Sequence, residues 1–315
     1  MARSDSLPQM PRETSPRTVA SEEAQRAKTR GHAVRFSSQA LIHLVLIACG
    51  LLVLFPFFWM VSSSLKQDWE VFQIPPSLIP VKPLWHNYLD VLSGNKGAFS
   101  FFGFVRNTLV ITMANLVGVL LTAPLVAYGF ARLRFPGRDI LFIIMLATMM
   151  IPGQVLMIPI YLIWAKLGFV DTYLPLTIGA FLGGSAFYIF LLRQFFFTIP
   201  HEYDEAARID GCGWLGIYWR IILPMAKPAL GTVAIFTFMA SWNDFMGPLI
   251  YISSMSKYTL AIGLHFFNSQ ASSSARPLWN LTMAASVVAM IPPLLLFFLA
   301  QRYYIQGVVV SGIKG

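Results

Sequence analysis

The sequence predicts an all-α, polytopic membrane protein with six transmembrane helices. Of its 315 residues, 56% are hydrophobic and only 12% are charged, and the mean hydropathy is +0.64. Soluble globular proteins carry about 25% charged residues, so this composition indicates a chain that uses lipid as its solvent. The two cysteines, Cys49 and Cys212, have neither the number nor the spacing of a disulfide framework or a metal site.

Six predominantly apolar runs are each long enough to cross a bilayer, for which about 20 residues are needed. Lipid offers backbone groups no hydrogen-bond partner, so each run is predicted to be a helix. The first run is too long for a cleaved signal and should remain in the membrane. The polar residues 1–39 before it are predicted to form a disordered cytoplasmic tail. The runs cover residues 40–62, 108–130, 140–165, 174–196, 229–251 and 281–303.

Prolines interrupt several of these runs. Membrane helices tolerate such breaks where neighbouring helices or a cavity satisfy the freed carbonyls. The prolines therefore indicate kinked helices, whose kinks either move during function or have no mechanical role. They are Pro56, Pro152, Pro159, Pro248, Pro292 and Pro293.

The basic residues predict the orientation of the chain in the cell membrane. With the N-terminus inside, 16 of the 23 Lys and Arg residues fall in inner segments and 7 in outer ones. The short loop with Arg132, Arg134 and Arg138 is the stronger indication, because long loops cross the membrane regardless of charge. Both termini are therefore expected in the cytoplasm. The same distribution accounts for the net charge of +9 without a nucleic-acid partner.

The segment between the fourth and fifth predicted spans, residues 198–228, has the pattern of a helix–turn–helix. Pro200 suits the first turn of a helix, where its missing N–H costs nothing. Asp204 and Arg208 are spaced i,i+4 and are predicted to pair on one face. Carboxylates occupy the first turns, where the positive end of the helix dipole favours them, at Glu202, Asp204 and Glu205.

Glycine and proline mark the ends of the two helices in this segment. Gly211 and Gly213 are expected to end the first helix, because glycine tolerates the left-handed cap conformation. The second helix, residues 214–223, is amphipathic and aromatic, and Pro224 is expected to stop it. Ala206 and Ala207 leave a bare surface that another protein could approach closely. On structural grounds alone, an ordinary amphipathic loop at the membrane interface is the alternative interpretation.

The residues of this segment resemble the EAA loop of ABC importer permeases. The match has fixed spacing over about twenty positions, and Cys212 stands where the family usually has alanine. Further segments, at residues 56–66, 127–138, 241–245 and 301–307, are similar to the maltose-type carbohydrate permeases. The residues that match the EAA loop are Glu205, Ala206, Ala207, Asp210, Gly211, Tyr218, Leu223 and Pro224.

This resemblance implies the core of a type I ABC importer permease, with the permease domain at residues 104–304. The implied partners are a second homologous permease, two ATP-binding subunits, an external solute-binding protein and membrane lipid. The matching EAA residues other than Tyr218 would dock on the ATPase. The chain has no phosphate-binding G-x-x-x-x-G-K-[ST] motif, so it is expected to be no enzyme and to bind no cofactor. ATP and Mg would be held by the partner ATPase.

Asp244 is the only acidic residue well inside a predicted span. A carboxylate at the centre of a membrane helix costs about 2.5–3.5 kcal/mol, so it should face the interior of the bundle. With Trp242, Asn243 and Phe245 it offers polar groups beside aromatic faces, which suits a hydroxyl-rich sugar in a solute pathway. The alternative is a structural cap at a helix break before Gly247 and Pro248.

Two other classes of membrane protein were weighed against the importer permease. An ion-coupled secondary transporter needs intramembrane ion or proton ligands, and Asp244 alone makes too few. A membrane enzyme needs paired carboxylates, a metal cluster or a nucleophile constellation, none of which stands out in the spans. The outer stretch at residues 252–280 is expected either to contact the binding protein or to be a passive connector.

Overall fold

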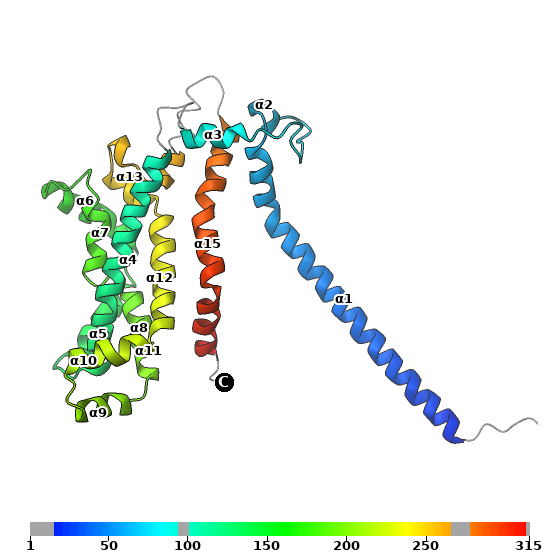
Figure 1. The fold of residues 1–315 in the computed structure, drawn as a ribbon, viewed down its shortest axis with the longest axis horizontal. Coiled ribbons are helices and arrows are strands. Elements are labelled where there is room, and N and C mark those ends of the chain that lie inside the picture. Colours follow the sequence, from blue (N-terminus) through cyan, green and yellow to red (C-terminus); the bar gives the residue numbers. More distant parts are fainter. Residues whose placement is uncertain (1–15, 94–100, 266–277, 313–315) are drawn as a thin grey trace, which may run out of the picture. The chain divides into compact units, whose positions relative to one another are not determined.

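The computed structural model describes residues 16–93, 101–265 and 278–312, and within these ranges the regular elements are helices without strands (Figure 1). The all-α prediction is confirmed. The chain divides into two compact units, residues 1–59 and 60–315, which are described separately. Within the described residues, four helices are long and apolar enough to cross a membrane alone, and up to six spans result if each sharply bent helix pair, at residues 138–166 and 214–242, counts as one. The upper count equals the six predicted spans, but the second bent pair begins and ends earlier than the predicted run at 229–251.

The first unit consists mainly of α1 (Pro16–Ser64), which contains the first predicted span. Its apolar side chains between Leu41 and Phe58 are exposed. The helix begins at Pro16, which differs from the disordered tail predicted up to residue 39; residues 1–15 lie outside the described part. The segment after Pro16 is rich in Ala, Glu, Gln, Arg and Lys, which favour helix. Because the apolar span has already formed a helix, the helix can extend into this segment without the cost of a new nucleus, and each added residue gains one hydrogen bond.

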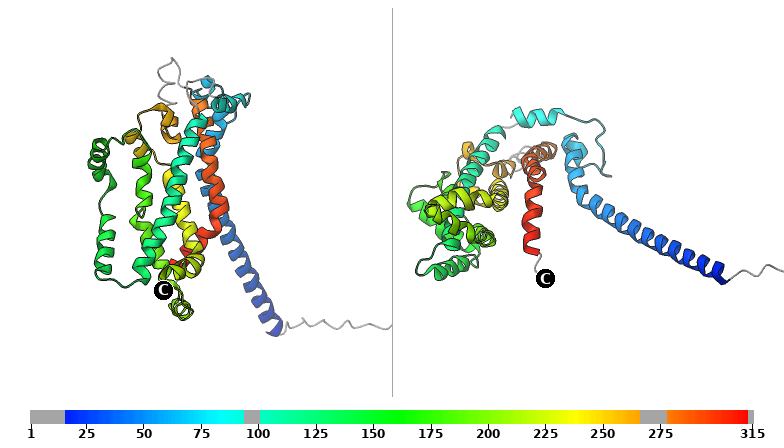
Figure 2. Two further views of the ribbon diagram at one scale, coloured as in Figure 1. Left: turned by 60° about the vertical axis from the view of Figure 1, so that its left-hand side comes forward. Right: turned by 60° about the horizontal axis from the view of Figure 1, so that its bottom comes forward.

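In the second unit, α4 is the central helix, and it packs against α7, α8 and α12. On its other side α12 packs against α15, so α4, α12 and α15 stand next to one another (Figure 2). The predicted spans at 108–130, 174–196 and 281–303 lie within α4, the α7–α8 pair and α15. The bounds are α4 (Phe101–Arg132), α7 (Leu174–Phe181), α8 (Ala186–Thr198), α12 (Lys227–Trp242) and α15 (Trp279–Gly312).

Two of the predicted spans are broken. The run at 140–165 forms α5 (Arg138–Thr148) and α6 (Gly153–Lys166), which meet at 97°. A proline, Pro152, lies at this junction, and proline disfavours helical geometry in the residue before it. The run at 229–251 forms α12 and α13 (Met246–Tyr251), with a break at residues 243–245.

Between α1 and α4 lies a small folded segment with α2 (Asp68–Val71) and α3 (His86–Ser93), which packs on the start of α15. Its centre is Lys66, which is 0% exposed and donates to the carbonyl of Ser77. Burial lowers the pKa of Lys66, and the nearby Glu70 opposes this shift. The amides of Asn87 and Asn280 donate to the carbonyl of Lys66, at 3.0 and 3.2 Å, and so join this segment to α15.

The closest approach of α4 to α7 depends on Gly118. A Cβ at this position would lie 2.9 Å from both the carbonyl carbon and the Cβ of Ala180. The Thr122 hydroxyl lies within 2.8 Å of the carbonyl oxygens of both Gly118 and Ala180, and can donate to either. Small residues at helix contacts let membrane helices pack by direct backbone approach.

Gly118→Ala is therefore expected to destabilise the second unit by about 1–3 kcal/mol, the usual cost of an overpacked contact. The measurement is the apparent unfolding temperature of the purified protein in detergent. Gly129→Ala, in the same helix, is the matched control because nothing lies within 4 Å of its added Cβ. Equal unfolding temperatures for the two variants would contradict the close α4–α7 contact.

Candidate functional site

The short helix α9 (Glu202–Ile209) lies at one end of the helical bundle of the second unit, opposite the end that carries α3 and α13 (Figure 1). Its first turn contains three carboxylates, as the sequence indicated. The helix starts at Glu202 with His201 as its N-cap, so Pro200 precedes the cap and is not in the first turn.

A glycine cap ends α9. Gly211 has a φ of +81°, in the left-handed region expected for it. Its N–H donates to the carbonyl of Arg208, and the N–H of Cys212 donates to that of Ala207, both at 2.9 Å. This pair of bonds is a Schellman motif. Gly213 has a negative φ and is instead the N-cap of the next helix.

The two faces of α9 differ in exposure. Glu205 and Ala206 are exposed, and Ile209 is 87% exposed. Ala207 is only 6% exposed and packs in the main apolar core. The expectation that both alanines form a bare surface is therefore wrong for Ala207, which lies on the face that turns toward the bundle.

The predicted pair of Asp204 and Arg208 does not form. Asp204 is buried, and its Oδ2 lies 3.3 Å from the guanidinium of Arg132, at the end of α4. The Arg208 guanidinium lies over the Trp214 ring, 3.8 Å from its centre. The i,i+4 spacing identified Arg208 as a possible partner. Because Asp204 lies on the buried face of α9, it pairs instead with Arg132, which is 72 positions earlier in the chain.

Arg132 has a structural role beyond the topology signal that it shares with Arg134 and Arg138. Its side chain is 0% exposed, whereas Arg134 is exposed. Its Nη2 donates to the carbonyls of Phe196 and Ile199, at 2.8 and 2.6 Å. The signal available in the sequence was an arginine placed as the last residue of an apolar run.

The second half of the segment forms one winding stretch that is anchored to α4. Ile217, Tyr218 and Ile222 are buried in the core, and the Tyr218 ring lies 5.2 Å from that of Tyr128. The Tyr128 hydroxyl donates to the carbonyl of Trp214 at 3.1 Å. The stretch consists of α10 (Trp214–Ile217), the π-helical turn η1 (Tyr218–Ile222) and α11 (Leu223–Met225).

Pro224 does not stop this stretch, contrary to expectation. It lies in the first turn of α11, and the chain bends by 77° only after Met225, where α12 begins. A proline removes one helical hydrogen bond and crowds the carbonyl four residues before it. The π-helical turn η1 ends two residues before Pro224, and such a local adjustment can re-satisfy the backbone groups that a proline frees. Leu223 is half-buried against the core, and Pro224 is exposed.

The four candidate pathway residues lie at the break between α12 and α13 but do not form one cluster. Trp242 is buried and donates from its indole N–H to the carbonyl of Ala289 in α15, at 3.2 Å. Asn243 is exposed and bonds back to Met239. Phe245 packs edge-on against His265, with ring centres 5.4 Å apart.

Asp244 is half-buried and has a clear structural role. Its Oδ1 accepts a hydrogen bond from the backbone N–H of Gly247 at 3.1 Å. This bond satisfies one of the N–H groups at the start of α13, which have no partner within the helix. The capping alternative is thus realised in the structure, and the pathway role stays a prediction.

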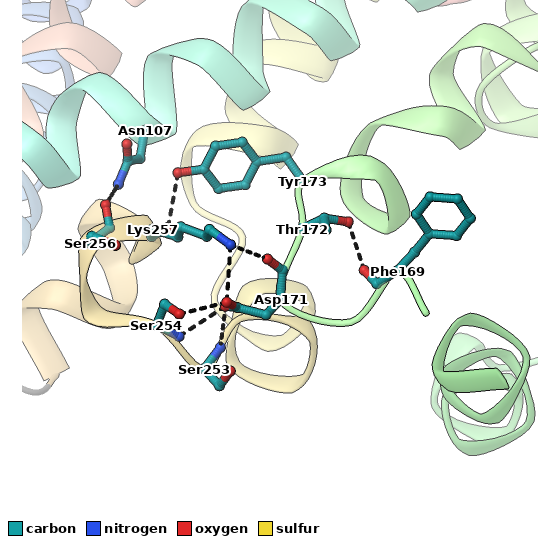
Figure 3. A network of polar contacts seen from close by, with 9 residues as sticks. All are labelled: Asn107, Phe169, Asp171, Thr172, Tyr173, Ser253, Ser254, Ser256 and Lys257. Atoms are coloured by element: carbon teal, nitrogen blue, oxygen red, sulfur yellow. Dashed lines mark hydrogen bonds and ion pairs between the residues drawn. The ribbon is translucent and has the colours of Figure 1, made fainter. Parts of the chain in front are cut away.

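A polar network that the sequence did not indicate surrounds Asp171, in the connection from α6 to α7 (Figure 3). Its Oδ1 accepts from the backbone N–H groups of Ser253 and Ser254, at 3.0 and 2.9 Å, and its Oδ2 lies 3.0 Å from the Lys257 ammonium. The φ of Asp171 is +60°, a conformation that aspartate adopts more readily than most residues.

The Asp171 network holds the segment after α13 in place. Asn107 of α4 donates to the carbonyl of Ser256 at 2.8 Å, and the Tyr173 hydroxyl donates to that of Lys257 (Figure 3). The first part of the predicted outer stretch, residues 252–265, is therefore fixed to α4 and α7. Residues 266–277 of that stretch lie outside the described part.

Asp171→Asn is expected to destabilise the protein at neutral pH. Hydrogen bonds, first from the Ser254 hydroxyl, hold the pKa of Asp171 well below its ordinary value. Because the unfolded pKa is about 3.9, the carboxylate stabilises fully above that pH and loses its contribution as the pH falls below it. The difference in unfolding temperature between wild type and variant should therefore shrink toward about pH 3.

The control for this measurement is Asp139→Asn, which removes an exposed carboxylate paired with Arg138. Exposed ion pairs contribute little, so its unfolding temperature should stay near the wild-type value. A constant difference between wild type and Asp171→Asn at all pH values would contradict the role of the Asp171 charge.

The long apolar helices define an integral membrane protein, and the partly exposed α9 projects from one end of the bundle. Within the described residues, no three His, Cys, Asp or Glu side chains gather as a metal site. The sequence matches the model of the family described as binding-protein-dependent transport system inner membrane component over residues 114–310. The chain belongs to this family.

Relatives agree with this assignment along nearly their whole length. The chain is 36% identical over 274 residues to the sn-glycerol-3-phosphate transport system permease protein UgpE of Yersinia enterocolitica, covering 85% of this chain and 95% of the relative. It is 32% identical to the arabinooligosaccharides transport system permease protein AraQ of Bacillus subtilis, covering 90% and 99%.

A solved structure supports the fold. The chain resembles the crystal structure of a bacterial ABC transporter involved in the import of the acidic polysaccharide alginate, with a TM-score of 0.73 and 26% identity. The match covers 84% of this chain and 96% of the other. The predicted type I importer permease is thereby confirmed. The chain is a multi-pass translocation subunit of the inner membrane, not an enzyme, and works with an ATPase and a binding protein.

Proposed function

We propose that this permease moves a sugar or a related polyol across the inner membrane, and that α9 is the point where the ATPase drives it. Relatives named for glycerol phosphate and for arabinooligosaccharides support the solute class. The observation that carries the drive point is the exposed Glu205 on a helix whose opposite face is buried in the bundle. ATP hydrolysis by a partner makes an ion gradient unnecessary, so the ion-coupled alternative is not retained.

The exposed face of α9 has the chemistry of a docking surface. Glu205 and Ile209 are spaced i,i+4 and lie on the same face, with Ala206 beside them. An isoleucine that is 87% exposed outside lipid gains free energy when a partner covers it. Glu205 would pair with a basic side chain of the ATPase in a charge-assisted hydrogen bond. Asp210, Gly211, Leu223 and Pro224 would support this docking by fixing the turn and the helices around it.

The proposed assembly contains this chain, a second homologous permease, two ATP-binding subunits and an external solute-binding protein. The ATPase would hold ATP and Mg, and this chain would bind no cofactor. With six spans, both termini would lie on the same side of the membrane as α9, which follows the fourth span. Because α9 would meet a cytoplasmic ATPase and the basic residues favour the same side, both termini are proposed to be cytoplasmic.

The coupling proposal predicts that Glu205→Ala weakens ATPase docking by about 1.5–3 kcal/mol, the usual contribution of a hydrogen bond to a charged group. Gly211→Pro should have a similar effect for a different reason, since proline cannot adopt the φ of +81° and removes the capping N–H. The measurement is solute-stimulated ATP hydrolysis by the reconstituted complex.

Asp139→Ala serves as the control for Glu205→Ala, because it removes an exposed carboxylate on another helix, α5. Its hydrolysis rate should match that of the wild type. Wild-type coupling in both Glu205→Ala and Gly211→Pro would rule out α9 as the drive point.

For the solute pathway, we propose that Asp244, Asn243 and the aromatic side chains of Trp242 and Phe245 contact the passing solute. Asp244→Asn keeps an oxygen that can cap α13 but removes the charge. It is expected to lower uptake while the complex still assembles. Asp244→Ala should in addition lower stability by about 0.5–2 kcal/mol, because the cap is lost.

Uptake of radiolabelled solute and recovery of the assembled complex are the two measurements for these variants. Unchanged uptake by Asp244→Asn would remove the residue from the pathway and leave only its capping role.

A further inference from the structure

We propose that Arg132 is a positioning residue that locks α9 to the ends of α4 and α8, so that these three helices move as one rigid body. The proposal rests on the proposed function of α9 as the drive point. It adds which part of the permease receives the movement, and through which side chain.

One guanidinium joins three elements. Arg132 is the last residue of α4, and its Nη2 binds the carbonyls of Phe196 and Ile199, at the C-terminal end of α8. Carbonyls at a helix C-terminus have no partner within the helix and carry partial negative charge, so they favour a cation. The Nη1 atom lies 3.3 Å from Oδ2 of Asp204 and 2.7 Å from Nδ1 of His201, at the start of α9.

The other end of the projection is tied to the same helix. Tyr128 lies one turn before Arg132 on α4, and its hydroxyl donates to the carbonyl of Trp214. The Trp214 ring in turn lies against the guanidinium of Arg208, in the last turn of α9. Two residues of α4 spaced i,i+4 therefore hold the start of α9 and the start of α10, and the Arg208–Trp214 contact links α10 back to the last turn of α9, which leaves α9 little freedom to pivot on the bundle.

The energetics of the pair favour a geometric role over a stabilising one. Burying an ion pair costs desolvation free energy, and an apolar pair of similar size is often at least as stable. Within the described residues, Nε of Arg132 and Oδ1 of Asp204 have no hydrogen-bond partner, so the cost is not fully offset. An apolar pair would not fix the relative orientation of the helices. The planar guanidinium does, because its donors point in fixed directions toward their acceptors.

This arrangement would transmit movement from the ATPase into the bundle. A displacement of α9 by the ATPase would move α4 directly, and α4 is the helix that packs against α7, α8 and α12. Rotation during the transport cycle would then take place between α9 and the ATPase, while the angle between α9 and α8 stays constant.

The first experiment measures this angle through a spin–spin distance. Labels on Gln194→Cys in α8 and Glu202→Cys in α9, both exposed positions, are placed in a chain with Cys49→Ser and Cys212→Ser. The expected result is one narrow distance that is the same in the nucleotide-free and the vanadate-trapped complex. A distance that changes between the two states would overturn the proposal.

The second experiment removes the lock. Asp204→Asn and Arg132→Lys keep the size or the charge of the residue but lose the ion pair or the planar fork. Both are expected to broaden the spin–spin distance distribution and to lower the solute taken up per ATP hydrolysed, with hydrolysis retained. Asp139→Asn and Arg134→Lys are the matched controls at exposed positions away from the two labels, and both should behave as the wild type.

A variant that removes both buried charges separates positioning from folding. Arg132→Met combined with Asp204→Leu leaves neither charge unpaired, but it frees the carbonyls of Phe196 and Ile199, so the variant should fold with a somewhat lower unfolding temperature than the wild type. It should still show the broad distance distribution and the low uptake per ATP. Wild-type uptake and a narrow distance in this double variant would show that the pair is only structural.

The two proposals can fail separately. If the wild-type complex shows no solute-dependent ATP hydrolysis, the proposed function fails. The distance measured in the isolated chain in detergent needs no ATPase and still tests the lock between α8 and α9.

Discussion

Backbone groups that are freed where a helix ends or breaks must find partners inside the protein, because lipid offers none. The polar side chains of this chain are placed by that constraint. The Arg132 guanidinium donates hydrogen bonds to carbonyls at the C-terminal end of α8. The Asp244 carboxylate accepts a hydrogen bond from an N–H at the N-terminal end of α13. Asp171 receives the backbone N–H groups of the segment that follows α13. These three places where regular helix ends are thus also polar junctions.

The same constraint explains why α9 has two unlike faces. The face toward the bundle presents Asp204 and Ala207, whose burial completes the junction around Arg132. The outer face carries Glu205 and Ile209 without a comparable partner within the described chain, which suits a surface that another subunit covers. A helix of eight residues would not be stable alone, so its position is set by the residues that hold its two ends.

Sequence reasoning was successful where the physics is local or where it depends on length. Apolar runs of about 20 residues identified the spans, since every such run must satisfy its own backbone. Gly211 identified the end of α9, because few other residues adopt its φ of +81°. Prediction from local spacing failed where Asp204 had two possible partners. Its i,i+4 spacing to Arg208 is favourable, but Asp204 pairs with the buried Arg132 of α4 instead.

The sequence by itself determined the class of this protein: an all-helical chain of the inner membrane, with an EAA loop that contains Glu205. These follow from composition, segment length and motif spacing, which are properties of neighbouring residues. Only the tertiary structure decided that Arg132 holds α8 and α9 together, that Asp171 fixes the segment after α13, and that residues 140–165 bend by 97°. The reason is that each of these three features depends on residues far apart in the chain or on how a helix break is packed. Several partners can be equally possible by sequence spacing, and burial in the folded protein selects one of them.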